Sequence, residues 1–121
     1  MQDFPYCIPY SRDITSEELA ILKFLVRDLD EITVEPEALT IVARCGCGQC
    51  PTILFGLRPD AEPVTSSESD HVAQWQGWNE GGTLVGVFLL AKDGVPTELD
   101  WASLNGGEDQ RWPPIEDLIP V

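Results

Sequence analysis

Positive charge is the scarcest feature of this sequence. Seven Lys and Arg residues stand against 21 Asp and Glu residues, which gives a formal net charge of −14. Residues 59–121 hold 12 acidic side chains and only two basic ones, Lys92 and Arg111. A protein that binds nucleic acid needs basic side chains to neutralise the phosphates. The charge therefore argues against nucleic acid, and equally against an anionic membrane surface, as a binding partner.

The sequence also lacks long apolar segments and the marks of an export signal. No stretch approaches the roughly 18 apolar residues that a transmembrane helix needs, and residues 1–10 contain two prolines and no basic cluster. We therefore expect a cytoplasmic protein. With 121 residues, 43% of them hydrophobic, the chain has the size and composition of a single folded domain over residues 1–121.

Local patterns in the first half predict one helix and a hairpin. Thr15 and Glu18 have the spacing of a capping box, and apolar residues at helical spacing follow them, so we expect an amphipathic helix over about 16–29. Alternation of apolar and polar residues then predicts extended segments at 39–45 and 52–57. The short turn between these segments is rich in cysteine and glycine.

The second half predicts further strands. Segment 71–78 fits a strand, and segment 83–91 is almost wholly apolar, as expected of a central strand that is buried on both faces. The Asp93-Gly94 pair that follows is the strongest local signal for a hairpin turn. Residues 105–121 read as irregular. Together these patterns predict an α+β fold, with an N-terminal amphipathic helix packed on a four- or five-stranded, mainly antiparallel sheet.

Three of the four cysteines fall within six residues. Cys47 and Cys50 have the two-residue spacing that lets both thiolates reach one tetrahedral zinc ion, and Cys45 lies on the same strand face as Cys47. Cys7 is a candidate fourth ligand if the N-terminal segment crosses the turn, and His71 is the alternative. The spacing is compatible with a zinc site, and free structural thiols and a disulfide or redox role are equally open interpretations.

Acidic residues and tryptophans of the second half are candidates for a protein interface. Glu98 and Asp100 alternate on one strand and are expected to face outward, either simply solvated or paired with a basic partner. Four tryptophans exceed what a core of this size requires, so some are expected to be exposed and to serve as interface anchors. The residues expected to contact the partner are Glu68, Asp70, Trp75, Trp78, Glu80, Glu98, Asp100, Glu108 and Asp109.

No catalytic motif is apparent. No serine occupies a Gly-x-Ser-x-Gly elbow, Cys50 has no recognisable partner base, and the glycine pairs do not form a phosphate-binding loop ahead of a helix. A lone His71 after an acidic loop is typical of a surface residue. We therefore expect a binding protein and not an enzyme, with a small enzyme using Cys50 or His71 as a third alternative.

Two segments resemble a group of small, acidic bacterial proteins of uncharacterised activity. These are 45–52, Cys-Gly-Cys-Gly-Gln-Cys-Pro-Thr, and 89–99, Leu-Leu-Ala-Lys-Asp-Gly-Val-Pro-Thr-Glu-Leu. In that group a Cys-Gly-Cys-Gly strand turn precedes an Asp-Gly hairpin and a Pro-rich end. The similarity covers about 17–118, with an extra Gln49 as a departure, and it implies a fold more than an activity.

In size, acidity and lack of catalytic residues the chain is also similar to immunity proteins that neutralise antibacterial toxins. This similarity implies that the chain binds a cognate toxin domain and blocks its active site, with an acidic, Trp-containing surface matched to a basic cleft. The alternative expectation is a small zinc-binding structural or regulatory protein.

Overall fold

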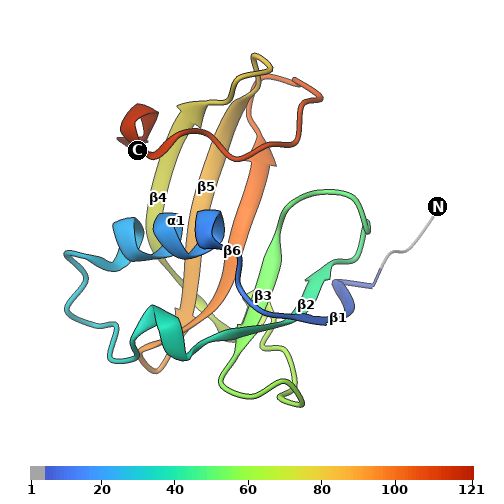
Figure 1. Cartoon of the computed structure of the whole chain (residues 1–121), viewed down its shortest axis with the longest axis vertical. Helices are drawn as coiled ribbons and strands as arrows, with labels where there is room; N and C mark the ends of the chain where they lie inside the picture. The colour runs from blue at the N-terminus through green and yellow to red at the C-terminus, as the bar shows by residue number, and fades with distance from the viewer. Residues whose placement is uncertain (1–4) are drawn as a thin grey trace.

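A computed structural model describes residues 5–121 and arranges their strands in one seven-stranded antiparallel sheet with α1 (Ser16–Val26) across one face (Figure 1). The strand order is β1-β2-β3-β6-β5-β4-β7. The α+β class is confirmed, but the expected number of four or five strands is wrong. The strands are β1 (Cys7–Arg12), β2 (Thr40–Cys45), β3 (Ile53–Gly56), β4 (Asp70–Trp78), β5 (Leu84–Lys92), β6 (Val95–Ser103) and β7 (Ile119–Pro120).

The two strands that the sequence patterns miss are the outermost ones, β1 and β7. Each of them contains a proline, Pro9 in β1 and Pro120 in β7. Proline cannot donate a backbone hydrogen bond, so strands that contain it are tolerated at sheet edges, where one side needs no partner. Segment 105–121, which includes β7, reads as irregular in the sequence, and no sequence pattern predicts β1.

The helix begins as predicted and ends earlier than predicted. The Thr15 hydroxyl accepts a hydrogen bond from the Glu18 amide at 3.2 Å, and the Glu18 carboxylate accepts one from the Thr15 amide at 2.9 Å, which completes the capping box. After Val26 the chain leaves the helix in a turn, yet Leu29 still packs against the core from this turn. The apolar pattern therefore continues beyond the last helical residue. None of the helices in residues 5–121 is long and apolar enough to span a membrane.

The long strands β4, β5 and β6 form the regular part of the sheet. Strand β5 lies between β6 and β4, as its apolar sequence predicts, and most of its side chains are buried. The hairpin to β6 turns at Asp93 and Gly94, whose φ angles of 52° and 83° are those of a turn with two left-handed residues. The Asp-Gly hairpin and the predicted strand at 71–78 are both confirmed.

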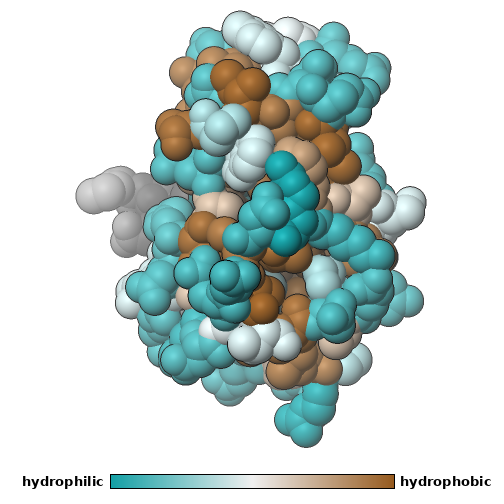
Figure 2. All heavy atoms as spheres, turned by 90° about the vertical axis from the view of Figure 1, so that its left-hand side faces the viewer, coloured by the Kyte–Doolittle hydropathy of each residue, from teal (hydrophilic) through white to brown (hydrophobic). Residues whose placement is uncertain are grey.

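The core lies between the sheet and α1. Ile21, Leu22 and Leu25 of the helix pack against the same face as Leu99 and the other core residues of the sheet. The C-terminal segment runs across the same side of the sheet (Figure 1) and adds buried apolar side chains to this core. Seen from the side on which β4 lies, hydrophilic residues cover most of the surface and hydrophobic residues form small, separate patches (Figure 2).

Within residues 5–121 no α-helix covers the face opposite α1, and the pairing of the strands is weakest at one position in the sheet. Strands β3 and β6 are paired at only two positions, Ile53 with Leu99 and Leu54 with Glu98. Beyond these pairs the two strands separate, and the side chain of Thr52 fills the gap. Its hydroxyl accepts a hydrogen bond from the Trp101 amide at 2.9 Å. This joint positions the cavity described below.

Candidate functional site

The turn between β2 and β3 places three cysteines close together. Cys45 is the last residue of β2, and Gly48, with a φ of +71°, reverses the chain behind it. The Gly48 amide donates to the Cys45 carbonyl at 2.9 Å and closes the turn. Gly46 has to be glycine, because a Cβ at this position would lie 1.7 Å from the carbonyl oxygen of Pro5. The glycines therefore allow the cysteines to converge.

The sulfur atoms of Cys45, Cys47 and Cys50 all lie within 4.8 Å of one another. Tetrahedral zinc, with Zn–S bonds of about 2.3 Å, holds its sulfur ligands about 3.8 Å apart. Movements of about 1 Å or less would bring the three sulfurs to that separation. The three sulfurs are thus close enough together to bind one tetrahedral ion after small side-chain movements.

The backbone of the turn also stabilises a thiolate. The sulfur of Cys47 accepts hydrogen bonds from the amides of Cys50 at 3.3 Å and Gln49 at 3.4 Å. Led by the Cys50 amide, these contacts lower the pKa of Cys47 to about 7. Burial raises the pKa of Cys45. Cys47 therefore ionises more readily than Cys45, and a thiolate is the form that binds a metal.

A positive charge lies beside the turn. Arg44 precedes Cys45 and, together with Cys50, lines a small cavity of about 140 Å³. Its guanidinium lies 5.0 Å from the centre of the Tyr10 ring, and its Nε is buried without a hydrogen-bond partner. In the part of the chain that the structure describes, no ion pair involves Arg44. Its charge is available to offset the negative charge of neighbouring thiolates.

In this structure the Cys7 sulfur lies outside this group, so the predicted fourth ligand is not placed with the other three. The backbone pairs Cys7 directly with Cys45 across β1 and β2, but the Cys7 side chain packs with Val42 and Leu54. His71, the predicted alternative, lies on β4 and is also outside the group. Within residues 5–121 the metal-ligand cluster therefore has three members and not four.

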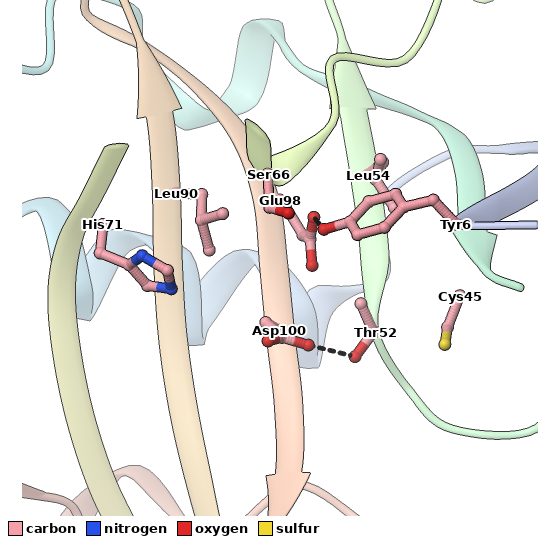
Figure 3. Close-up of a pocket in the computed structure, with 9 residues that line it drawn as sticks. All are labelled: Tyr6, Cys45, Thr52, Leu54, Ser66, His71, Leu90, Glu98 and Asp100. Atoms are coloured by element: carbon pink, nitrogen blue, oxygen red, sulfur yellow. Dashed lines mark hydrogen bonds between the residues drawn. The ribbon is translucent and has the colours of Figure 1, made fainter. Parts of the chain in front are cut away.

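A cavity of about 340 Å³ lies next to the turn, on the sheet face opposite α1. Figure 3 shows Glu98 and Asp100 on β6, with Glu98 directed toward Tyr6 and Asp100 toward Thr52. The Tyr6 hydroxyl donates to Glu98, and the Thr52 hydroxyl donates to Asp100 at 2.9 Å. His71 lines the cavity from β4. The remaining lining residues are Cys45, Leu54, Ser66 and Leu90.

The acidic residues of this cavity are not solvated as expected from the sequence. Glu98 is only 3% exposed and Asp100 is partly buried. Burial raises the pKa of Glu98 to about 7, against the opposing effect of the Tyr6 hydrogen bond and with a further increase from the charge of Asp100. Burial also raises the pKa of Asp100. Glu98 faces away from α1 as expected, but the expectation that water surrounds it is wrong, because Tyr6 and the neighbouring strands cover it.

The other residues expected to contact a partner do not form one continuous patch. Asp70 and Trp78 are the first and last residues of β4. They are eight residues apart, so their Cα atoms are separated by about 26 Å. Glu80 and Asp109 both pair with Arg111, at 3.3 and 2.7 Å, near the Trp78 end. The two remaining acids, Glu68 and Glu108, are exposed.

The four tryptophans divide into three kinds. Trp101 and Trp112 are buried in the core. Trp75 is half-buried, with its ring centre 4.9 Å from that of Phe24 on α1, so it extends the core. Trp78 is 55% exposed. Of the two tryptophans predicted to act as interface anchors, Trp78 has the greater exposed surface.

Sequence patterns miss Tyr6, Thr52 and Ser66 as lining residues of the cavity. Tyr6 reaches Glu98 across 92 positions of sequence, and no local pattern signals such a contact. Of these three residues, Thr52 could have been found most easily from the sequence. A threonine that is buried beside a cysteine-rich turn needs a hydrogen-bond partner. Comparisons with protein-family models, with curated proteins and with solved structures find no match for this chain.

Proposed function

We propose that this protein binds one zinc ion through Cys45, Cys47 and Cys50, and that its role is binding rather than catalysis. The observation that carries this proposal is the convergence of three sulfur atoms within 4.8 Å at a turn built by glycines. Zinc is the metal that best fits thiolate ligands in near-tetrahedral positions without a redox function. The spacing of the cysteines and the amide hydrogen bonds to Cys47 support the same assignment.

Charge at the site is consistent with this proposal. Three thiolates and one Zn²⁺ carry a net charge of −1, and the nearby guanidinium of Arg44, whose Nε has no hydrogen-bond partner among residues 5–121, can offset it. Three protein ligands leave a fourth position for water, for a ligand from outside, or for Cys7 after a change of rotamer. The bound ion would fix the β2–β3 turn and, through Cys45, one wall of the neighbouring cavity.

The proposal also favours a cytoplasmic location. Reduced cysteines persist in a reducing compartment, whereas four cysteines in an oxidising one tend to form disulfides. All four cysteines are free thiols in this structure. We therefore expect the zinc-bound protein to function where thiols stay reduced.

The test is the metal content of the protein after anaerobic purification, with zinc affinity measured by competition against a chromogenic chelator. We expect one zinc per chain, and loss of high-affinity zinc in each of the variants C45A, C47A and C50A. The matched control is C7A, which removes a cysteine outside the group and should keep the zinc. Absence of zinc binding, or equal zinc binding in all four variants, would contradict the proposal. Preferential uptake of copper(I) would contradict the choice of metal.

A second candidate function is that of an immunity-type inhibitor, which binds a toxin domain and blocks its active site. A net charge of −14 and the exposed ring of Trp78 beside the acidic Glu80 support it. Such a surface favours fast encounter with a basic cleft. Affinity purification of the tagged protein at low salt should yield one stoichiometric protein partner that high salt releases. A purification without any such partner would count against this function.

A further inference from the structure

The cavity beside the cysteine turn contains two acidic side chains and few positively charged groups that could neutralise them. One oxygen of Glu98 accepts a hydrogen bond from Tyr6, and one oxygen of Asp100 accepts one from Thr52. In the described part of the chain no ion pair involves either carboxylate. His71 is the one lining residue that can carry a positive charge.

Keeping both acidic groups ionised in this cavity is costly without a cation. A carboxylate that is removed from water loses hydration energy, which is recovered when a positive group with good hydrogen-bond geometry pairs with it. Glu98 is 3% exposed, and its second oxygen has no hydrogen-bond partner among the described residues. This oxygen is therefore a free acceptor in a largely covered site.

The spacing of the two carboxylates limits what can bind between them. Glu98 and Asp100 are two residues apart on β6, so their Cβ atoms are separated by about 6.6 Å. A single ammonium or guanidinium group placed between such carboxylates can donate hydrogen bonds to both. Leu54, Leu90 and the ring of Tyr6 supply apolar walls that a short methylene chain can contact.

A bare metal ion fits the cavity less well. Metal binding needs several ligand atoms that converge on one point, and in residues 5–121 only the three cysteines of the turn do so. The carboxylates and the imidazole of the cavity thus lie too far apart to share one ion. An anion is disfavoured by the two acidic residues.

We propose that this cavity binds an alkylammonium or alkylguanidinium group, with Glu98 and Asp100 as its counter-ions and Tyr6 and Leu90 against its methylene chain. The group can belong to a small free amine or to a lysine or arginine side chain of a protein. The proposal does not require zinc at the cysteine turn, although Cys45 lines both sites. A protein source would join it to the second candidate function.

The test is NMR titration of the protein with n-butylammonium and n-butylguanidinium at low salt, with n-butanol as the neutral control. We expect saturable shifts of the β6 and β5 amides around the cavity with the two cations and none with butanol. The variants Glu98→Gln and Asp100→Asn should each weaken binding roughly ten- to a hundredfold, as expected for the loss of a hydrogen bond to a charged group.

Matched variants distinguish the cavity from general attraction to an acidic protein. Glu116→Gln and Asp117→Asn make the same chemical changes at exposed positions of η3 (Ile115–Asp117) and should leave the affinity unchanged. A short peptide with a central lysine separates the two sources. Tighter binding by the peptide than by butylammonium assigns the cavity to a protein side chain, and equal or weaker binding assigns it to a free amine.

Two results would overturn the proposal. One is the absence of saturable binding by either cation and by the peptide. The other is binding that the exposed variants weaken as much as Glu98→Gln and Asp100→Asn do. Because Glu98→Gln removes a buried charge, this variant is expected to fold, and its amide spectrum will verify this.

Discussion

The Tyr6 hydroxyl donates a hydrogen bond to the carboxylate of Glu98, joining the segment before β1 to the middle of β6. The contact closes one side of the acidic cavity. It also favours the ionised form of Glu98, since a donor stabilises a carboxylate more than a carboxylic acid.

The first prediction concerns the loss of this hydroxyl. Tyr6→Phe should raise the pKa of Glu98 further, because the Tyr6 hydrogen bond is the contact that lowers it. A ¹³C NMR titration of the glutamate carboxyls will measure the change. Tyr10→Phe is the control, since the Tyr10 hydroxyl bonds to Arg12 and not to Glu98. An unchanged Glu98 titration in Tyr6→Phe would show that the hydrogen bond does not form in solution.

The second prediction is a fall in stability as the pH rises toward neutrality. Burial raises the pKa of Glu98 to about 7 from an ordinary 4.5, so between these values the folded chain holds a proton that the unfolded chain has released. The contribution of Glu98 to the free energy of unfolding is therefore complete below about pH 4.5 and lost through about pH 7. At about 1.4 kcal/mol per pKa unit, the loss is at most about 3 kcal/mol.

The variant Glu98→Gln isolates this contribution from that of other titrating groups. The titratable groups that face Glu98 are Tyr6, Cys45, His71 and Asp100, with the Cys7 thiol nearby. Burial also raises the pKa of Asp100, so Asp100, like Glu98, lowers the free energy of unfolding as the pH rises. Urea unfolding from pH 4.5 to 7.5 should show that the wild type loses stability relative to Glu98→Gln. Parallel curves for the two proteins would refute the prediction.

The third prediction concerns the start of the helix. Arg12 donates two hydrogen bonds to the Glu18 carboxylate, at 2.8 and 2.7 Å, and Glu18 is 5% exposed. Although burial acts to raise the pKa of Glu18, the hydrogen bonds from Arg12 and Thr15 lower it overall. Glu18→Gln should cost about 2–3 kcal/mol at neutral pH, somewhat less than for a fully buried ion pair, because the Arg12 side chain is 31% exposed.

Acid should remove the same stabilisation in the wild type. Because the folded pKa of Glu18 lies below the unfolded value, the contribution is present above about pH 4.5 and is lost as the pH falls through the folded pKa. Urea unfolding at neutral and acidic pH measures both effects. Glu37→Gln is the control, since Glu37 forms a solvent-exposed pair with Lys23 and should change stability little. An equal effect of both substitutions would contradict the assigned role of Glu18.

Much of the fold is predictable from local sequence, because local interactions determine it. The capping box at Thr15 and the Asp93-Gly94 turn are each formed by neighbouring residues. The edge strands escape prediction because, among residues 5–121, each pairs with a strand that is distant in sequence. The helix end is misplaced because Leu29 continues the apolar pattern from a turn.

The same distinction applies to the candidate site. The spacing of Cys45, Cys47 and Cys50 predicts their convergence, since all three belong to one turn. The role predicted for Cys7 depends on the orientation of the Cys7 side chain in β1, a strand far from the turn in sequence. No local sequence pattern determines this orientation. The burial of Glu98 has the same origin, because its cover comes from Tyr6.

The fourth prediction separates Cys7 from the metal ligands. Zinc should protect Cys45, Cys47 and Cys50 from alkylation by N-ethylmaleimide and leave the modification of Cys7 unchanged, because the Cys7 sulfur lies outside the group. Mass spectrometry of peptides from the zinc-loaded and zinc-free protein gives the ratio for each cysteine. Equal protection of Cys7 would show that it rotates to become the fourth ligand.

The most direct test of the central claim is the absorption spectrum of the protein with one equivalent of Co²⁺ under anaerobic conditions. Cobalt in a tetrahedral thiolate site gives thiolate-to-metal charge-transfer absorption and intense visible bands, and zinc displaces it. The account predicts this spectrum for the wild type and for C7A, and its loss in C45A, C47A and C50A. The weak spectrum of hydrated, octahedral cobalt in the wild type would contradict it.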